Sequence, residues 1–239
     1  MAKRPPPGKC VHCLKETDRL NWDHVFPYAW YPDSTPKDIY KWQIPSCIPC
    51  NNEYGVLEKD LMIRFGLCLE PDDEACKGIV EKALRSIDPD QAKNEKDRKA
   101  RLGKRRQIIR QTMEGDAIPD EAIYPNFESR YAIPDSERVA VTISKKSVDR
   151  LAEKIVRGIL YLENGVFVDE SYEINIFTLT DSGAASIVET VRRFGEEHSK
   201  GPGIVVLRAI VPDDNISSVF VITIWGRFKT YLVVLNKDM

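Results

Sequence analysis

The sequence predicts an α+β protein with a small N-terminal lobe, a helical segment, and a C-terminal α+β domain with a mainly antiparallel sheet. Three observations carry this prediction. The first fifty residues contain two C-x2-C pairs and few long apolar runs. Helical apolar spacing then continues as far as residue 113, and short alternating runs typical of strands dominate after residue 137.

Length and composition limit the class of protein. The chain has 239 residues, of which 42% are hydrophobic and 30% charged, as in a globular protein with a sizeable core. No apolar run approaches the roughly 18 residues that a membrane span needs. The basic N-terminus is not followed by the apolar segment of a secretory signal. We therefore expect a cytoplasmic protein that does not associate with membranes.

The cysteines divide into two matched pairs and two isolated residues. Cys10/Cys13 and Cys47/Cys50 are C-x2-C pairs separated by 33 residues. Such pairs each offer two thiolates from one tight turn, so together they predict a closed, structural Zn²⁺ site. We expect Cys68 and Cys76 to be small buried residues and His12, between two ligands, to be exposed.

Four segments follow from these patterns. We predict a metal-held lobe over residues 1–66, a helical extension over 67–113, a proline-containing linker over 114–137, and an α+β domain over 138–239. The extension includes a helix over 76–86 and a long polar helix within 91–113. This second stretch contains nine basic and two acidic residues, although the whole chain has a net charge of −2. One local element is therefore suited to contact phosphate.

The C-terminal segment reads as βαβαβββ. Alternating residues predict strands over 138–143 and 173–179, and helical spacing predicts helices over 148–162 and 181–197. Three further runs, 204–211, 219–225 and 230–235, predict an antiparallel meander. His198 precedes a Gly-Pro-Gly loop and is expected to be exposed.

An Asp-His pair lies between the two cysteine pairs. His24 follows Asp23 and precedes Pro27, and Asn51 directly follows the last cysteine of the second pair. Over about residues 8–60 this order of motifs resembles the HNH endonucleases, the ββα-metal nucleases in their zinc-stapled form.

The resemblance implies a division of roles. His24 would be the general base that takes a proton from the attacking water, since a neutral histidine is available near pH 7. Asp23 and Asn51 would hold one catalytic divalent ion, Mg²⁺ or Mn²⁺, at a phosphodiester of nucleic acid, with DNA as the expected substrate. Where many members carry a lysine, this chain has Tyr54, so Lys59 or Arg64 is expected to hold substrate.

The basic stretch adds a predicted nucleic-acid surface. Its members are Arg101, Lys104, Arg105, Arg106 and Arg110. The same residues are also compatible with a solvated surface helix.

Two alternatives stay open for the whole chain: a non-catalytic zinc-knuckle module that binds nucleic acid or protein, and a nuclease effector of host defence that a partner restrains. The C-terminal domain would then serve recognition, regulation or self-association as a homo-oligomer.

Overall fold

A computed structural model describes residues 4–119, 124–125, 134–199 and 201–237. The described residues form five α-helices and a five-stranded antiparallel sheet, which confirms the predicted α+β class. Parts of the predicted linker, 120–123 and 126–133, lie outside the described residues. Among the helices that are described, none is long and apolar enough to cross a membrane.

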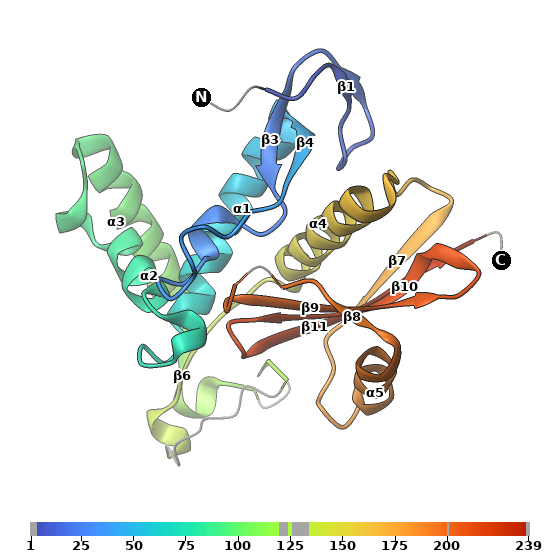
Figure 1. Ribbon diagram of the computed structural model, residues 1–239. Helices are drawn as coiled ribbons and strands as arrows, with labels where there is room; N and C mark the ends of the chain where they lie inside the picture. The colour runs from blue at the N-terminus through green and yellow to red at the C-terminus, as the bar shows by residue number, and fades with distance from the viewer. Residues whose placement is uncertain (1–3, 120–123, 126–133, 200, 238–239) are drawn as a thin grey trace.

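The N-terminal part consists of two short hairpins followed by a long helix (Figure 1). The first hairpin pairs β1 (Gly8–Lys9) with β2 (Glu16–Thr17), and the second pairs β3 (Leu20–His24) with β4 (Gln43–Cys47). Helix α1 (Ile48–Gly66) begins directly after β4, with a proline in its first turn. Proline is favoured there because the first helical N–H groups have no partner within the helix. The strand that ends at Cys47 therefore leads without a loop into α1.

Two helices pack beside α1. Helix α2 (Ile79–Ile87) crosses α1 where Gly66 faces Ala83, and a side chain at Gly66 would lie 2.6 Å from the Cβ of Ala83. Helix α3 (Glu95–Arg110) forms most of the predicted basic helix, and Asn94 caps it by accepting a hydrogen bond from the backbone N–H of Asp97. These helices confirm the two predicted in the extension.

The C-terminal sheet has the strand order β7-β11-β10-β9-β8. The strands are β7 (Tyr172–Phe177), β8 (Glu196–Glu197), β9 (Ile204–Val211), β10 (Asp214–Ile224) and β11 (Phe228–Asn236). Helices α4 (Lys145–Asn164) and α5 (Ala185–Phe194) lie on opposite sides of the sheet (Figure 1). Alternate residues of β10 face the two helices: Phe220 and Ile222 join the core with α4, and Val221 joins the smaller core with α5.

The predicted strands of the C-terminal segment are all present, and the structure adds two features that the sequence does not predict. Strand β6 (Val139–Val141) pairs with β5 (Thr112–Glu114) and not with the large sheet. Helix α5 ends at Phe194, and β8 follows where the sequence predicts more helix. Gly195 marks this change, since a Cβ there would lie 2.3 Å from the carbonyl oxygen of Val191. Alternation predicts that a segment is extended, but it does not identify the partner strand.

One buried core connects the N-terminal lobe to the sheet. Trp225 is fully buried in the turn directly after β10. It stacks on Trp30 with ring centroids 4.8 Å apart, and its indole N–H donates to the carbonyl oxygen of Trp30 at 3.0 Å. Phe65 of α1 stacks on Phe228 of β11 at 4.0 Å. Buried aromatic rings of the lobe therefore pack directly against those of the sheet region. The segment boundaries at residues 66, 113 and 137 stay predictions.

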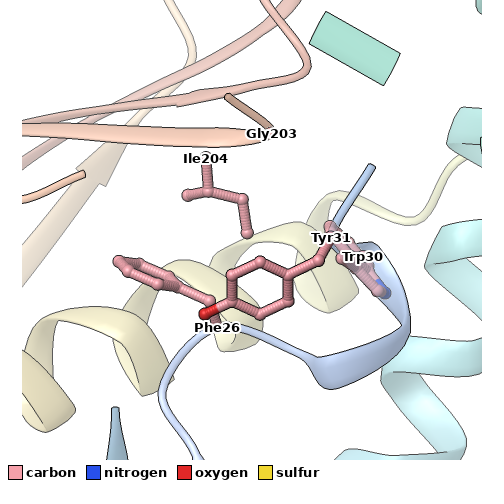
Figure 2. A pocket seen from close by; sticks show the side chains of 5 residues that line it. All are labelled: Phe26, Trp30, Tyr31, Gly203 and Ile204. Atoms are coloured by element: carbon pink, nitrogen blue, oxygen red, sulfur yellow. The ribbon is translucent and has the colours of Figure 1, made fainter. Parts of the chain in front are cut away.

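A shallow recess marks part of this junction (Figure 2). Phe26, Trp30 and Tyr31 line it from the lobe, and Gly203 and Ile204 line it from the start of β9. The recess has no room for a water-sized molecule, so it is a packing seam and not a ligand site.

Candidate metal centre and neighbouring polar site

The four paired cysteines converge on one point. Their Sγ atoms all lie within 4.8 Å of one another, and the Sγ atoms of Cys13 and Cys47 are 3.7 Å apart. Zinc–sulfur bonds of about 2.3 Å in a tetrahedron give sulfur–sulfur edges of about 3.8 Å. The cluster therefore fits a tetrahedral metal such as zinc, which confirms the predicted ligand set.

The local backbone explains how the ligands meet. The turn after β1 closes with a hydrogen bond from the N–H of Leu14 to the carbonyl oxygen of Cys10. Cys47 ends β4 and donates its N–H to the Sγ of Cys10 at 3.2 Å, and Cys50 follows in the first turn of α1. Burial would raise the pKa of Cys10, but backbone donors at Cys13 and Cys47 lower it to about 7. This thiol is therefore partly ionised near neutral pH, as a metal ligand requires.

The cluster fixes the strands that carry Asp23 and His24. Leu20 pairs with Cys47, so β3 runs antiparallel to β4 from the cluster outward, with Asp23 opposite Ile44 and His24 opposite Gln43. Because successive residues of a strand point to opposite faces, Asp23 and His24 face different surroundings. No hydrogen bond joins Asn51 to either of them within the described residues.

His24 lies half-buried at the end of β3. The Nε2 of Gln43 donates to the Nε2 of His24 at 3.0 Å, and the ring of Tyr28 lies 5.3 Å away. The ammonium of Lys41 lies 4.0 Å from the centre of the Tyr28 ring. Burial lowers the pKa of His24, and the charges of Lys154 and Lys41 lower it further, while Asp23 opposes them. The imidazole is therefore neutral at pH 7, which is the state that a general base needs.

Asp23 is buried and has a partner at each oxygen. His12 Nε2 lies 3.0 Å from its Oδ2, and the ammonium of Lys154, on α4, donates to its Oδ1 at 2.9 Å. The same ammonium also donates to Oε1 of Glu58 on α1. Burial would raise the pKa of Asp23, but the hydrogen bond from His12 and the charge of Lys154 hold it below its ordinary value. The carboxylate of Asp23 is therefore ionised, and partners within the protein already balance its negative charge.

The expectation that His12 is exposed is wrong. Its side chain is only 2% exposed and packs on the ring of Tyr54, with ring centroids 4.6 Å apart. The expectation for His198 is also wrong, because its side chain is 10% exposed and its Nδ1 lies 2.6 Å from a carboxylate oxygen of Glu163. Both histidines pair with carboxylates distant in sequence, which local patterns do not reveal. Cys76 is buried and Cys68 partly buried, as expected.

Sequence patterns missed Glu58 and Lys154 as members of the polar site. One signal was present, since Lys154 lies three residues after Leu151 on the apolar stripe of its helix. A charged residue on such a stripe must either extend to the surface or find a buried partner. Lys154 is fully buried, so it takes the second course.

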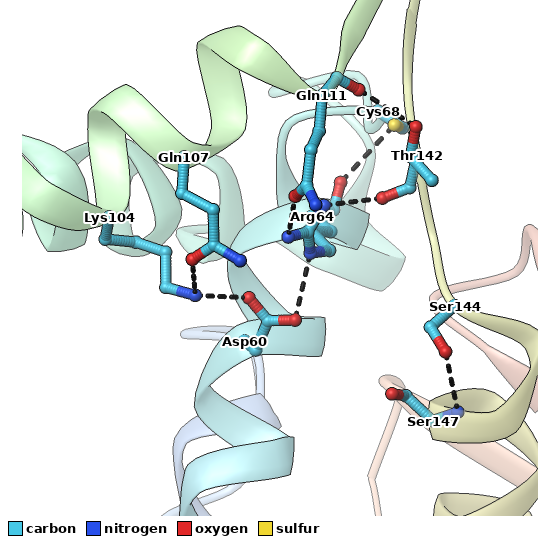
Figure 3. Close-up of polar contacts among 9 residues, drawn as sticks. All are labelled: Asp60, Arg64, Cys68, Lys104, Gln107, Gln111, Thr142, Ser144 and Ser147. Carbon is cyan, nitrogen blue, oxygen red and sulfur yellow. Dashed lines mark hydrogen bonds and ion pairs between the residues drawn. The ribbon is translucent and has the colours of Figure 1, made fainter.

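The predicted nucleic-acid residues differ in exposure. Arg64 is buried, and its guanidinium donates to Asp60, Gln111 and the carbonyl oxygen of Thr142 (Figure 3). Lys104 also binds Asp60, at 2.6 Å. The Nε of Arg101 lies 3.1 Å from a carboxylate oxygen of Asp97. The remaining four are exposed: Lys59, Arg105, Arg106 and Arg110. Three of the seven residues that were predicted to contact nucleic acid are therefore already bound to other groups of the protein.

Comparison with known proteins adds no relative: no family model, no curated protein and no solved structure matches the chain. The chemistry of the site rests on its own residues.

Proposed function

We propose that the chain is a metal-dependent endonuclease of the HNH type, which hydrolyses phosphodiester bonds in nucleic acid, with DNA as the substrate. The observation that carries the proposal is the cysteine cluster, which ties the turn between β1 and β2 to the junction of β4 and α1, and so to the β3–β4 hairpin. This arrangement is a ββα unit with Asp-His on its first strand and Asn51 in the first turn of its helix. This order of elements supports the proposal.

His24 acts as the general base in this proposal. Its lowered pKa keeps the ring neutral, so Nε2 has a lone pair for a proton from water. Gln43 now donates to that atom, and water must replace this donor before proton transfer. Asp23 and Asn51 would hold a Mg²⁺ or Mn²⁺ ion, which when bound neutralises charge on the scissile phosphate. Zinc at the cysteines keeps these elements in register and takes no part in cleavage.

The exposed cations would bind the nucleic-acid backbone. Arg105, Arg106 and Arg110 lie on α3, and Lys59 lies on α1. Lysine and arginine side chains bind phosphates without reading sequence, so they would position the strand.

A second candidate is a zinc-held binding module that does not cut. One observation favours it: both oxygens of Asp23 already have partners inside the protein. The C-terminal domain would serve recognition or self-association in either case.

Plasmid nicking distinguishes the candidates. The zinc-loaded chain and its His24→Ala variant are incubated with supercoiled DNA, and in parallel with RNA, in Mg²⁺ or Mn²⁺. We expect nicking that the variant loses by about 10²–10⁴-fold, because it lacks the general base. His198→Ala is the matched control and should cut like the wild type. Equal rates for wild type and His24→Ala would remove the assigned base, and no cleavage under any condition would leave the binding module.

A further inference from the structure

Lys154 joins three distant parts of the chain. It lies on α4 of the C-terminal segment, is fully buried, and donates to Asp23 of β3 and Glu58 of α1. We propose that Lys154 is an internal cation that keeps the carboxylate of Asp23 from a divalent ion, so that α4 restrains the nuclease. This inference rests on the proposed function and assigns its regulation.

Lys154 is one of three residues on the same face of α4 that contact the ββα unit. Three residues spaced four apart, and therefore on one side of the helix, face the ββα unit. Arg150 binds Glu53 of α1 at 2.5 Å, Lys154 binds the two carboxylates, and Gly158 packs against Val25 just after β3. A Cβ at Gly158 would lie 2.8 Å from a methyl carbon of Val25. The absence of a side chain at Gly158 therefore permits the approach that Lys154 needs.

A divalent ion and the ammonium compete for the same carboxylate. Mg²⁺ requires direct contact with a ligand oxygen at about 2.0–2.1 Å. Oδ1 of Asp23 already accepts from Lys154 at 2.9 Å, and Oδ2 accepts from His12. A dication beside an ammonium would also be repelled, and burial strengthens that repulsion. Lys154 therefore opposes ion binding to Asp23, and its withdrawal would favour such binding.

We call the contact of Lys154 on α4 with Asp23 the latch. Helix α4 also contacts the C-terminal sheet, so the latch is connected to the rest of the protein. The helix contacts β10 and β7 of this sheet (Figure 1). A displacement of α4 relative to the ββα unit would break the contacts of Arg150, Lys154 and Gly158 together. Helix α4 therefore contacts both the ββα unit that contains Asp23 and the C-terminal sheet.

The test measures Mn²⁺ binding by electron paramagnetic resonance on the zinc-loaded full chain, separately from cleavage. Lys154→Met keeps the length of the side chain and removes its charge, and we expect it to bind Mn²⁺ at least about tenfold more tightly than wild type. Adding Asp23→Asn should abolish that gain. Lys146→Met, an exposed lysine on the same helix, is the matched control and should bind as wild type does.

A second variant covers the case in which Lys154→Met does not fold. Gly158→Ala leaves every charge in place and favours the helix, yet its methyl group pushes α4 away from Val25. We expect tighter Mn²⁺ binding by about threefold and faster nicking at limiting Mn²⁺. If the folded variants bind Mn²⁺ no better than wild type, the latch is wrong, whether or not the protein cuts DNA. If they bind it more tightly but nothing is cut, the latch stands and the proposed nuclease activity falls.

Discussion

Trp225→Phe tests whether the N-terminal lobe and the sheet form one cooperative unit. The indole N–H donates to the carbonyl oxygen of Trp30 in a fully buried setting. Losing that bond and leaving the carbonyl without a donor costs about 1–2 kcal/mol. The space left by the smaller ring adds about 1 kcal/mol. The free energy of unfolding should therefore fall by about 2–3 kcal/mol.

The assay is urea unfolding of the zinc-loaded chain, with circular dichroism reporting the fold and a zinc-binding dye reporting release from the cysteines. Both transitions should shift to lower urea together, because Trp30 belongs to the lobe and Trp225 directly follows β10 of the sheet. Tyr40→Phe, at a tyrosine that is 73% exposed, is the control and should change stability by less than about 0.5 kcal/mol. A shift of one transition without the other would show that the shared core does not couple the two parts.

Three further results are expected. Cys50→Ser should abolish stoichiometric zinc binding, measured by mass spectrometry, and expose the β3–β4 amides to hydrogen exchange, because three thiolates do not close the tetrahedron. Below about pH 6.5, stability should fall in part through His24: its folded pKa is lowered, so the unfolded chain takes up the proton first, and His24→Gln should flatten that slope in urea titrations. Replacing Arg105 and Arg106 by Ala should reduce the salt dependence of DNA affinity by a slope of about two, and an unchanged slope would show that α3 does not contact phosphate.

The sequence alone was sufficient for features that depend on spacing. Two C-x2-C pairs predict a four-sulfur cluster because each turn presents two thiolates, and the cluster is present. The apolar spacing of α4 and the alternation of β9, β10 and β11 likewise predict elements that the structure contains. These are local properties, since helix and strand periods are set by the backbone.

Only the tertiary structure decided which distant residues meet. It placed Lys154 on Asp23, 131 positions away in the chain, and it buried His12 beside the same carboxylate. It also paired β6 with β5 outside the large sheet. Packing and charge neutralisation in the core determine such contacts, and neither produces a periodic pattern in the sequence. Whether Asp23 is available to an ion depends on that packing, and the motif that contains Asp23 does not reveal it.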